Sequence, residues 1–160
     1  MRNSIEAVIG RSKFVEEKHL LIQIDGISLD EVLDRFHPEK EICGLIPAWL
    51  DWMESPADRS ETLRRLTASE ADFVVPLLMC PDDLDFSCSL IVAEVRQEKD
   101  CVWWNRVGMN RQDLWGFPEQ LGKDVEWFEA VPPFEFEKTE YKECVRSFLD
   151  QWRDPALSGL

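Results

Sequence analysis

Residues 89–107 read SLIVAEVRQEKDCVWWNRV, and this stretch decides the fold. Two runs rich in β-branched and aromatic residues, SLIVAEV and VWWNRV, flank the charged linker Gln97–Asp100. This pattern predicts an antiparallel β-hairpin. Trp103 and Trp104 are adjacent, so their side chains must point to opposite faces of the sheet. Helices would cover one face, and the other would show an indole to solvent or to a partner.

Other segments also have the composition of strands. FVVPLLMC, before the hairpin, is a continuous apolar run whose Pro76 suits an edge strand or a bulge. Residues 4–10 and 19–24 predict two strands, and the turn dipeptide Asp25-Gly26 closes the second. VEWFEAV and PFEFE, further along, predict two short strands around a Pro-Pro pair, after a long polar loop.

Helical spacing appears in four places. Ser28 and Glu31 have the S-x-x-E form of a capping box, and the helix that they begin would end at His37-Pro38. Pro47 would start a second helix, AWLDWMES, which Pro56 would break. SETLRRLT predicts a short helix capped by its first serine, and EYKECVRSFLDQW predicts a C-terminal amphipathic helix. The chain is therefore expected to form one α+β domain, a mainly antiparallel sheet with helices packed on one face.

Negative charge is spread along the whole chain. Residues 1–80 hold 15 acidic and 9 basic side chains (−6), and residues 81–160 hold 17 and 9 (−8), which gives the net charge of −14. Such a field repels phosphate backbones and anionic membranes, and it favours a basic protein as partner. The alternative is that the acidity serves only to keep the protein in solution.

The five cysteines show no CxxC pair, and their spacing matches no zinc or iron–sulfur pattern. The first residues lack the apolar segment of a signal peptide, and no apolar run has the length of a membrane span. These features favour a cytoplasmic protein with reduced thiols, without a structural metal or a cofactor.

The segment MCPDDLDFSC, residues 79–88, concentrates Asp82, Asp83 and Asp85. It does not fit an EF-hand, because Cys88 stands where the calcium loop needs glycine and a strand follows at once. Aspartates beside a proline are typical of a turn between strands, since their side chains bond nearby backbone amides. A looser divalent-ion site, or a carboxylate pair of a small hydrolase, remains the alternative for this cluster.

Motifs of nucleophilic catalysis are absent from the sequence: it has no G-x-S-x-G, no Walker loop and no G-x-G-x-x-G. Chain order alone leaves open a pair of Cys43 or Cys80 with His19 or His37. Cysteines in apolar runs are usually small buried hydrophobes, however. We therefore expect no catalytic residue.

The net negative charge and the seven tryptophans together suggest a surface that binds a basic protein. Indoles would supply desolvated contact area, while carboxylates would supply steering and discrimination. The alternative is that the tryptophans outside the helices cover a second small core. The expected contact residues are Asp82, Asp83, Asp85, Trp104, Trp115, Glu126 and Glu129.

Five stretches occur in a familiar order: IDGISLDEVL, CGLIPAWLDW, PLLMCPDDLDFSCSLIVAEV, VWWNRVG and VEWFEAVPPFEF. Over residues 20–148 the chain thereby resembles a group of small uncharacterised bacterial proteins associated with immunity proteins of polymorphic-toxin and contact-dependent-inhibition systems. The resemblance implies a cytoplasmic, non-enzymatic protein that binds and blocks a toxin domain, and it assigns no functional residues. Because many such toxins are basic nucleases, it agrees with the acidity of the chain.

Overall fold

The computed structural model describes residues 2–68, 72–87, 89–114 and 116–152. Within these residues the strands are β1 (Ile5–Ser12), β2 (Val15–Ile24), β3 (Ile27–Ser28), β4 (Ile46–Pro47), β5 (Asp72–Met79), β6 (Ile91–Gln97), β7 (Cys101–Asn110), β8 (Val125–Trp127) and β9 (Phe134–Glu137). The helices are α1 (Leu29–Phe36), α2 (Pro56–Leu66) and α3 (Lys138–Leu149), with short 3-10 turns η1 (Pro38–Lys40) and η2 (Pro118–Gln120). The named strands pair antiparallel, which confirms the predicted α+β class.

The predicted hairpin is the centre of a six-stranded sheet. Strands β6 and β7 pair with each other, and the sheet has the order β4-β5-β6-β7-β8, with β9 pairing the first half of β7. Trp104 is 0% exposed, whereas Trp103 is partly exposed on the opposite face, as their adjacency predicts. Pro76 lies where the β5–β6 register shifts, so the bulge interpretation is confirmed.

The two predicted N-terminal strands form a second, three-stranded sheet with β3. Both are longer than expected, because the charged residues between them continue the ladder down to a tight turn after Ser12. Asp25 and Gly26 make the next turn, with φ of 52° and 83°. A two-residue turn with positive φ at both positions matches the twist of a hairpin, so β2 returns directly into β3.

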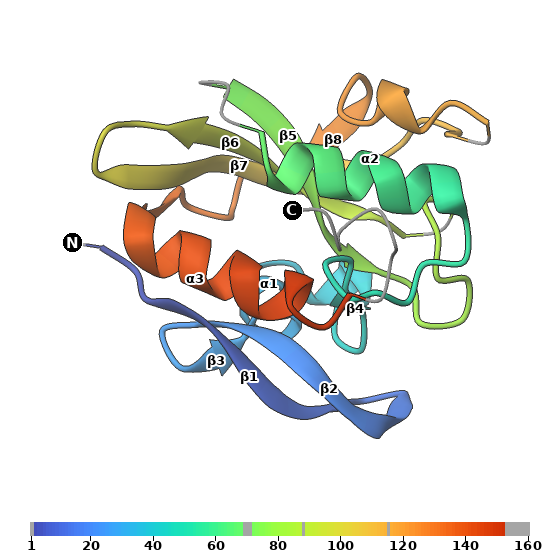
Figure 1. Ribbon diagram of the computed structural model, residues 1–160, viewed down its shortest axis with the longest axis horizontal. Coiled ribbons are helices and arrows are strands. Elements are labelled where there is room, and N and C mark those ends of the chain that lie inside the picture. The colour runs from blue at the N-terminus through green and yellow to red at the C-terminus, as the bar shows by residue number, and fades with distance from the viewer. Residues whose placement is uncertain (1, 69–71, 88, 115, 153–160) are drawn as a thin grey trace.

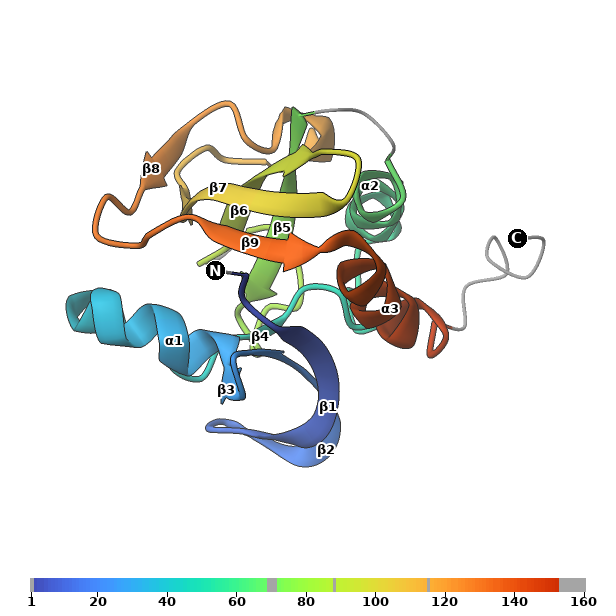
Figure 2. The same ribbon diagram turned by 90° about the vertical axis from the view of Figure 1, so that its left-hand side faces the viewer.

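Helix α3 lies between the two sheets (Figures 1 and 2) and contacts β1, β7 and β9. Its buried side chains belong to one hydrophobic core that includes residues of both sheets. Within this core, Tyr141 meets the Trp104 ring, and Phe148 meets Trp49 edge-to-face at 5.6 Å. The backbone N–H of Asn3 also donates to the carbonyl of Glu135 at 2.7 Å, which ties the start of the chain to β9.

The predicted capping box at α1 is wrong, although the helix itself runs as expected to Phe36. The hydroxyl of Ser28 donates to Asp30 Oδ1 at 2.5 Å and caps no amide of the helix. Asp30 is buried, and its other carboxyl oxygen accepts from the Gly44 N–H at 2.9 Å. A charged acceptor at this distance outcompetes the backbone amides for the serine hydroxyl.

The predicted helix AWLDWMES is also wrong, because residues 48–55 form turns after the short strand β4. Ala48 donates its N–H to the carbonyl of Leu77, so this backbone continues along β5. Pro56 starts α2 rather than ending a helix, and Ser55, not Ser60, is its cap. Proline suits the first helical position because its missing N–H would have no partner there.

Candidate functional site

The segment 79–88 is a turn between β5 and β6, as the proline and aspartates predict. The N–H of Leu84 donates to the carbonyl of Cys80 at 3.1 Å, and Asp85 Oδ1 accepts from the N–H of Ser87 at 2.8 Å. Asp82 and Asp83 are exposed. Cys88 lies outside the described residues.

Another aspartate, Asp58, which the sequence alone did not indicate, holds this turn in place. Asp58 in the first turn of α2 is only 8% exposed, and its Oδ2 accepts from the N–H of Phe86 at 3.1 Å. Burial raises the pKa of the Asp58 carboxyl, the charge of Asp85 adds to the rise, and the hydrogen bond from Phe86 opposes it. The S-x-x-D spacing that starts at Ser55 was the available signal, but nothing local indicates that its aspartate bonds a residue 28 positions away.

Trp104 is wrongly predicted as a contact residue, because its indole is in the core. It packs edge-to-face on Phe136 at 4.8 Å, and its Nε1 lies 3.4 Å from the hydroxyl oxygen of Tyr141. Trp103 is the tryptophan on the outer face, where the guanidinium of Arg96 lies 5.7 Å from its ring. Alternation along the strand could not tell which indole the helices would cover.

The remaining predicted contact residues lie apart. Trp115 lies outside the described residues. Glu126 on β8 pairs with Lys40 at 3.0 Å and with Arg111, and the hydrogen bonds from these cations lower the pKa of its carboxyl. Two cations therefore compensate this one carboxylate, which makes it a poor attraction for a basic partner. Glu129, just after β8, is exposed.

The predicted contact residues do not form one surface. The aspartate turn and Glu126 lie at the same end of the six-stranded sheet, since Leu78, Ile91, Met109 and Glu126 follow one another across it. Strands β6 and β7 separate them, however, and each strand spacing is about 4.8 Å. The turn and β8 thus border opposite sides of this sheet end.

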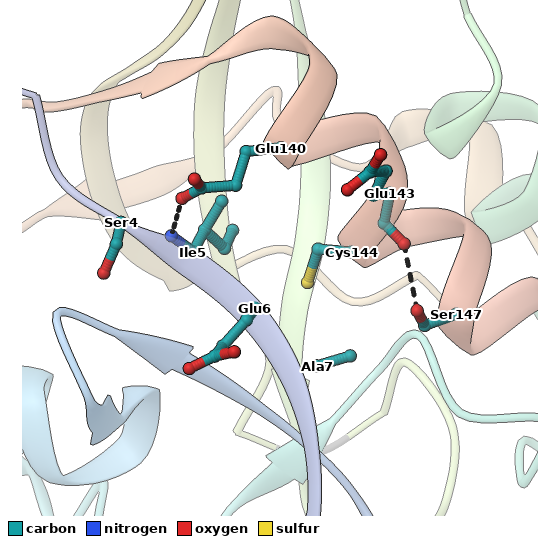
Figure 3. Close-up of a pocket in the computed structure, with 8 residues that line it drawn as sticks. All are labelled: Ser4, Ile5, Glu6, Ala7, Glu140, Glu143, Cys144 and Ser147. Carbon is teal, nitrogen blue, oxygen red and sulfur yellow. Dashed lines mark hydrogen bonds between the residues drawn. The ribbon is translucent and has the colours of Figure 1, made fainter.

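A groove between β1 and α3 brings together three further carboxylates (Figure 3). Its volume is about 400 Å³, and we call it the β1–α3 groove. It is lined by Ser4, Ile5, Glu6, Ala7, Glu140, Glu143, Cys144 and Ser147. No lysine or arginine is among these lining residues. The strand supplies one glutamate and the helix two, from opposite ends of the chain.

Two of the three glutamates have no partner within the described part of the chain. Glu140 Oε1 accepts from the backbone N–H of Ile5 at 2.7 Å, so this carboxylate fastens the helix to the strand. Glu6 and Glu143 are exposed at the two sides of the groove, and no described side chain pairs with them. Their charges therefore remain available to a molecule outside the protein.

The pKa of the Cys144 thiol, which lines the groove, reflects its burial and this negative charge. Burial raises the pKa of its thiol to about 12, and the charges of Glu6 and Glu140 add to the rise. A thiol with so high a pKa stays protonated and is a poor nucleophile. Cys144 is therefore a packing residue, and the groove offers recognition of positive charge rather than nucleophilic chemistry.

None of the described contacts pairs Cys43 or Cys80 with His19 or His37. His19 is buried, its Nδ1 lies 3.0 Å from the carbonyl of Leu20, and its Nε2 lies 3.0 Å from the hydroxyl of Ser12. His37 pairs with Glu39 at 2.9 Å. Each histidine thus bonds an oxygen close to it in sequence.

Within the described ranges, no three histidine, cysteine, aspartate or glutamate side chains converge as they would around a metal ion. None of the described helices has the length and apolarity needed to cross a membrane. No protein-family model, curated protein or solved structure shows significant similarity to the chain.

Proposed function

We propose that the chain is a non-enzymatic binding protein that neutralises a basic protein partner, a nuclease-like toxin domain, in the cytoplasm. The single observation that carries the proposal is the β1–α3 groove, in which three glutamates face a concave surface without a lysine or arginine. A guanidinium or ammonium group that entered the groove would contact Glu6 and Glu143, and no described lysine or arginine pairs with either carboxylate. Charge-assisted hydrogen bonds of this kind are about twice as strong as neutral ones.

An exposed apolar side chain, Ile9, lies further along β1 than the residues that line the groove. Ile9 is 55% exposed, and it lies two residues beyond Ala7 on β1, so the two side chains point the same way. An apolar anchor beside a charged rim is the usual composition of a protein–protein contact. Ile9 thus takes the anchoring role expected of Trp104, whose indole is buried.

Long-range charge supports the same partner class. The net charge of −14 steers cationic proteins toward the chain and repels nucleic acid. An acidic protein of this kind would block a basic nuclease by occupying its phosphate-binding surface. The aspartate turn and Glu129 remain candidate secondary contacts, while Glu126 contributes little because Lys40 and Arg111 already compensate it.

The rival function, a small hydrolase or divalent-ion binder using Asp82–Asp85, has less support. Asp82 and Asp83 are exposed at the turn, and Asp85 is engaged by the amide of Ser87. The feature nearby that does favour a ligand is the buried Asp58, which lines a pocket of its own.

The test is a binding measurement between the chain and the product of the adjacent reading frame, at low and at physiological salt. We expect a tight complex whose association rate falls steeply as salt increases. Glu6→Gln/Glu143→Gln should weaken it by about tenfold or more, because both substitutions act inside the groove.

The control is Asp82→Asn/Asp83→Asn, which removes the same two charges from the turn. Both double variants have a net charge of −12 (−14 + 2), so long-range steering is matched and only the local contact differs. No complex at low salt would contradict the proposal. Equal weakening by both variants would show that the groove is not the contact.

A further inference from the structure

A separate pocket lies between the first turn of α2 and the segment that follows the aspartate turn. Its volume is about 280 Å³. It is lined by Ser55, Ala57, Asp58, Asp85, Phe86, Ser87, Leu114, Gly116 and Pro118. Apolar side chains make up much of its wall, and among the described lining residues only Asp58 and Asp85 are charged.

Asp58 is more than nine-tenths buried, and no described cation pairs with it. Its Oδ2 accepts from Phe86, but its Oδ1 has no hydrogen-bond partner among the described residues. A buried carboxylate without a cation is costly, and the positive end of α2 offsets only part of that cost. An asparagine would accept the same hydrogen bond from Phe86, so the fold itself does not require the negative charge.

Asp85 lines the same pocket and adds a second negative charge, which contributes to the raised pKa of the Asp58 carboxyl. Two carboxylates at one pocket exclude an anion. They are too few to strip the water from a divalent ion, which prefers six or more oxygen ligands. A cation with a short apolar stem satisfies both the charges and the walls formed by Phe86, Leu114 and Pro118.

We propose that this pocket binds an alkylammonium group, with the ammonium at Asp58 and Asp85 and the stem against Phe86 and Leu114. Such a group is carried by a free alkylamine and equally by a lysine side chain. The site is distinct from the β1–α3 groove, since the two share no lining residue. Its existence therefore does not depend on the proposed function.

The experiment titrates the full chain with n-butylammonium and follows the backbone amide signals of Phe86 and Ser87 by NMR. We expect saturable shifts at both amides, and at least about tenfold weaker binding of n-butanol, which has the same shape without the charge. Asp58→Asn should weaken n-butylammonium binding by about tenfold or more while keeping the bond to Phe86. Asp85→Asn, at a less buried position, tests the second carboxylate, and Asp82→Asn/Asp83→Asn should leave binding unchanged.

A second titration with Nα-acetyl-lysine N-methylamide identifies the source of the group. Binding of this probe supports a lysine side chain as ligand, whereas binding of n-butylammonium alone supports a small free amine. The proposal is overturned if n-butanol binds as well as n-butylammonium, if neither charged probe shifts the two amides, or if a folded Asp58→Asn variant binds like the wild type.

Discussion

The indole N–H of Trp49 donates to the carbonyl of Pro76 at 2.7 Å, and this bond joins the turns after β4 to the bulge of β5. Trp49 is fully buried, whereas the indole nitrogen of Trp103 is buried without a hydrogen-bond partner in the described structure. The two tryptophans therefore form a matched pair, in which the same substitution removes a bonded donor at one site and an unbonded donor at the other.

Trp49→Phe should lower the free energy of unfolding by at least about 2 kcal/mol, because it leaves a buried carbonyl without this donor and opens a small cavity. Trp103→Phe should change it by less than about 1 kcal/mol, since no bond is lost. Urea unfolding of both variants measures the difference. Equal losses would contradict a stabilising role of the bond to Pro76.

Asp58→Asn should be more thermally stable than the wild type at neutral pH. Burial raises the pKa of the Asp58 carboxyl above its ordinary value of 3.8, so the folded state holds the proton more tightly than the unfolded chain. The charged carboxyl thus costs stability at neutral pH, and the cost disappears as pH falls through the raised pKa. The advantage of asparagine in Tm should therefore shrink toward about pH 4.

Asp58→Ala serves as the control for this prediction. It removes the charge but also the acceptor, and an unpaired Phe86 N–H costs about 1–3 kcal/mol. The Asp58→Ala variant should consequently be less stable than the Asp58→Asn variant at every pH. If Asp58→Asn were no more thermally stable than the wild type at neutral pH, the buried charge of Asp58 would not be destabilising the fold.

Gly108→Ala should loosen β8 from the sheet. A Cβ on Gly108 would collide with the carbonyl oxygen of Glu126 and lie 2.9 Å from Trp127 Cα, and backbone atoms in a ladder cannot turn away. We expect a loss of about 1–3 kcal/mol in unfolding free energy. Hydrogen exchange of the β8 amides would locate the damage.

Gly10→Ala is the matched strand glycine. Its Cβ would approach only the Leu21 side chain, with Cδ1 at 2.8 Å, and a terminal methyl can move aside. Alanine also reduces the conformational freedom of the unfolded chain, which favours folding. Gly10→Ala should therefore lower the free energy of unfolding by less than Gly108→Ala does. The reverse order would show that the collision with backbone atoms is not what destabilises Gly108→Ala.

Lys40→Met should raise the pKa of Glu126. Hydrogen bonds from Lys40 and Arg111 hold the pKa of this carboxyl below its ordinary value of 4.5, so the ion pairs stabilise the fold above that pH, and their effect is lost as pH falls through the lowered pKa. NMR titration of the Glu126 carboxyl carbon measures the shift. Lys142→Met, on α3, is the control and should leave that titration unchanged.

Local sequence patterns predicted the strands well because a strand depends on alternation and turn residues over a few positions. The hairpin of β6 and β7, the Asp25-Gly26 turn and the bulge at Pro76 all follow from such patterns. Local patterns predicted the wrong secondary structure where a residue distant in sequence bonds the segment. Trp49 has helical spacing, but its bond to Pro76 and the pairing of its neighbours with β5 hold the segment out of a helix.

The candidate sites were the least predictable part. The groove needs Glu6 beside Glu140 and Glu143, and the amine pocket needs Asp58 beside Asp85, so both depend on segments far apart along the chain. The sequence by itself determined the α+β class, the antiparallel hairpins and the excess of negative charge, because these follow from composition and short-range periodicity. Only the tertiary structure decided which indole is buried and which carboxylates lack a cation, because burial and charge pairing arise from contacts that form when the two sheets close on α3.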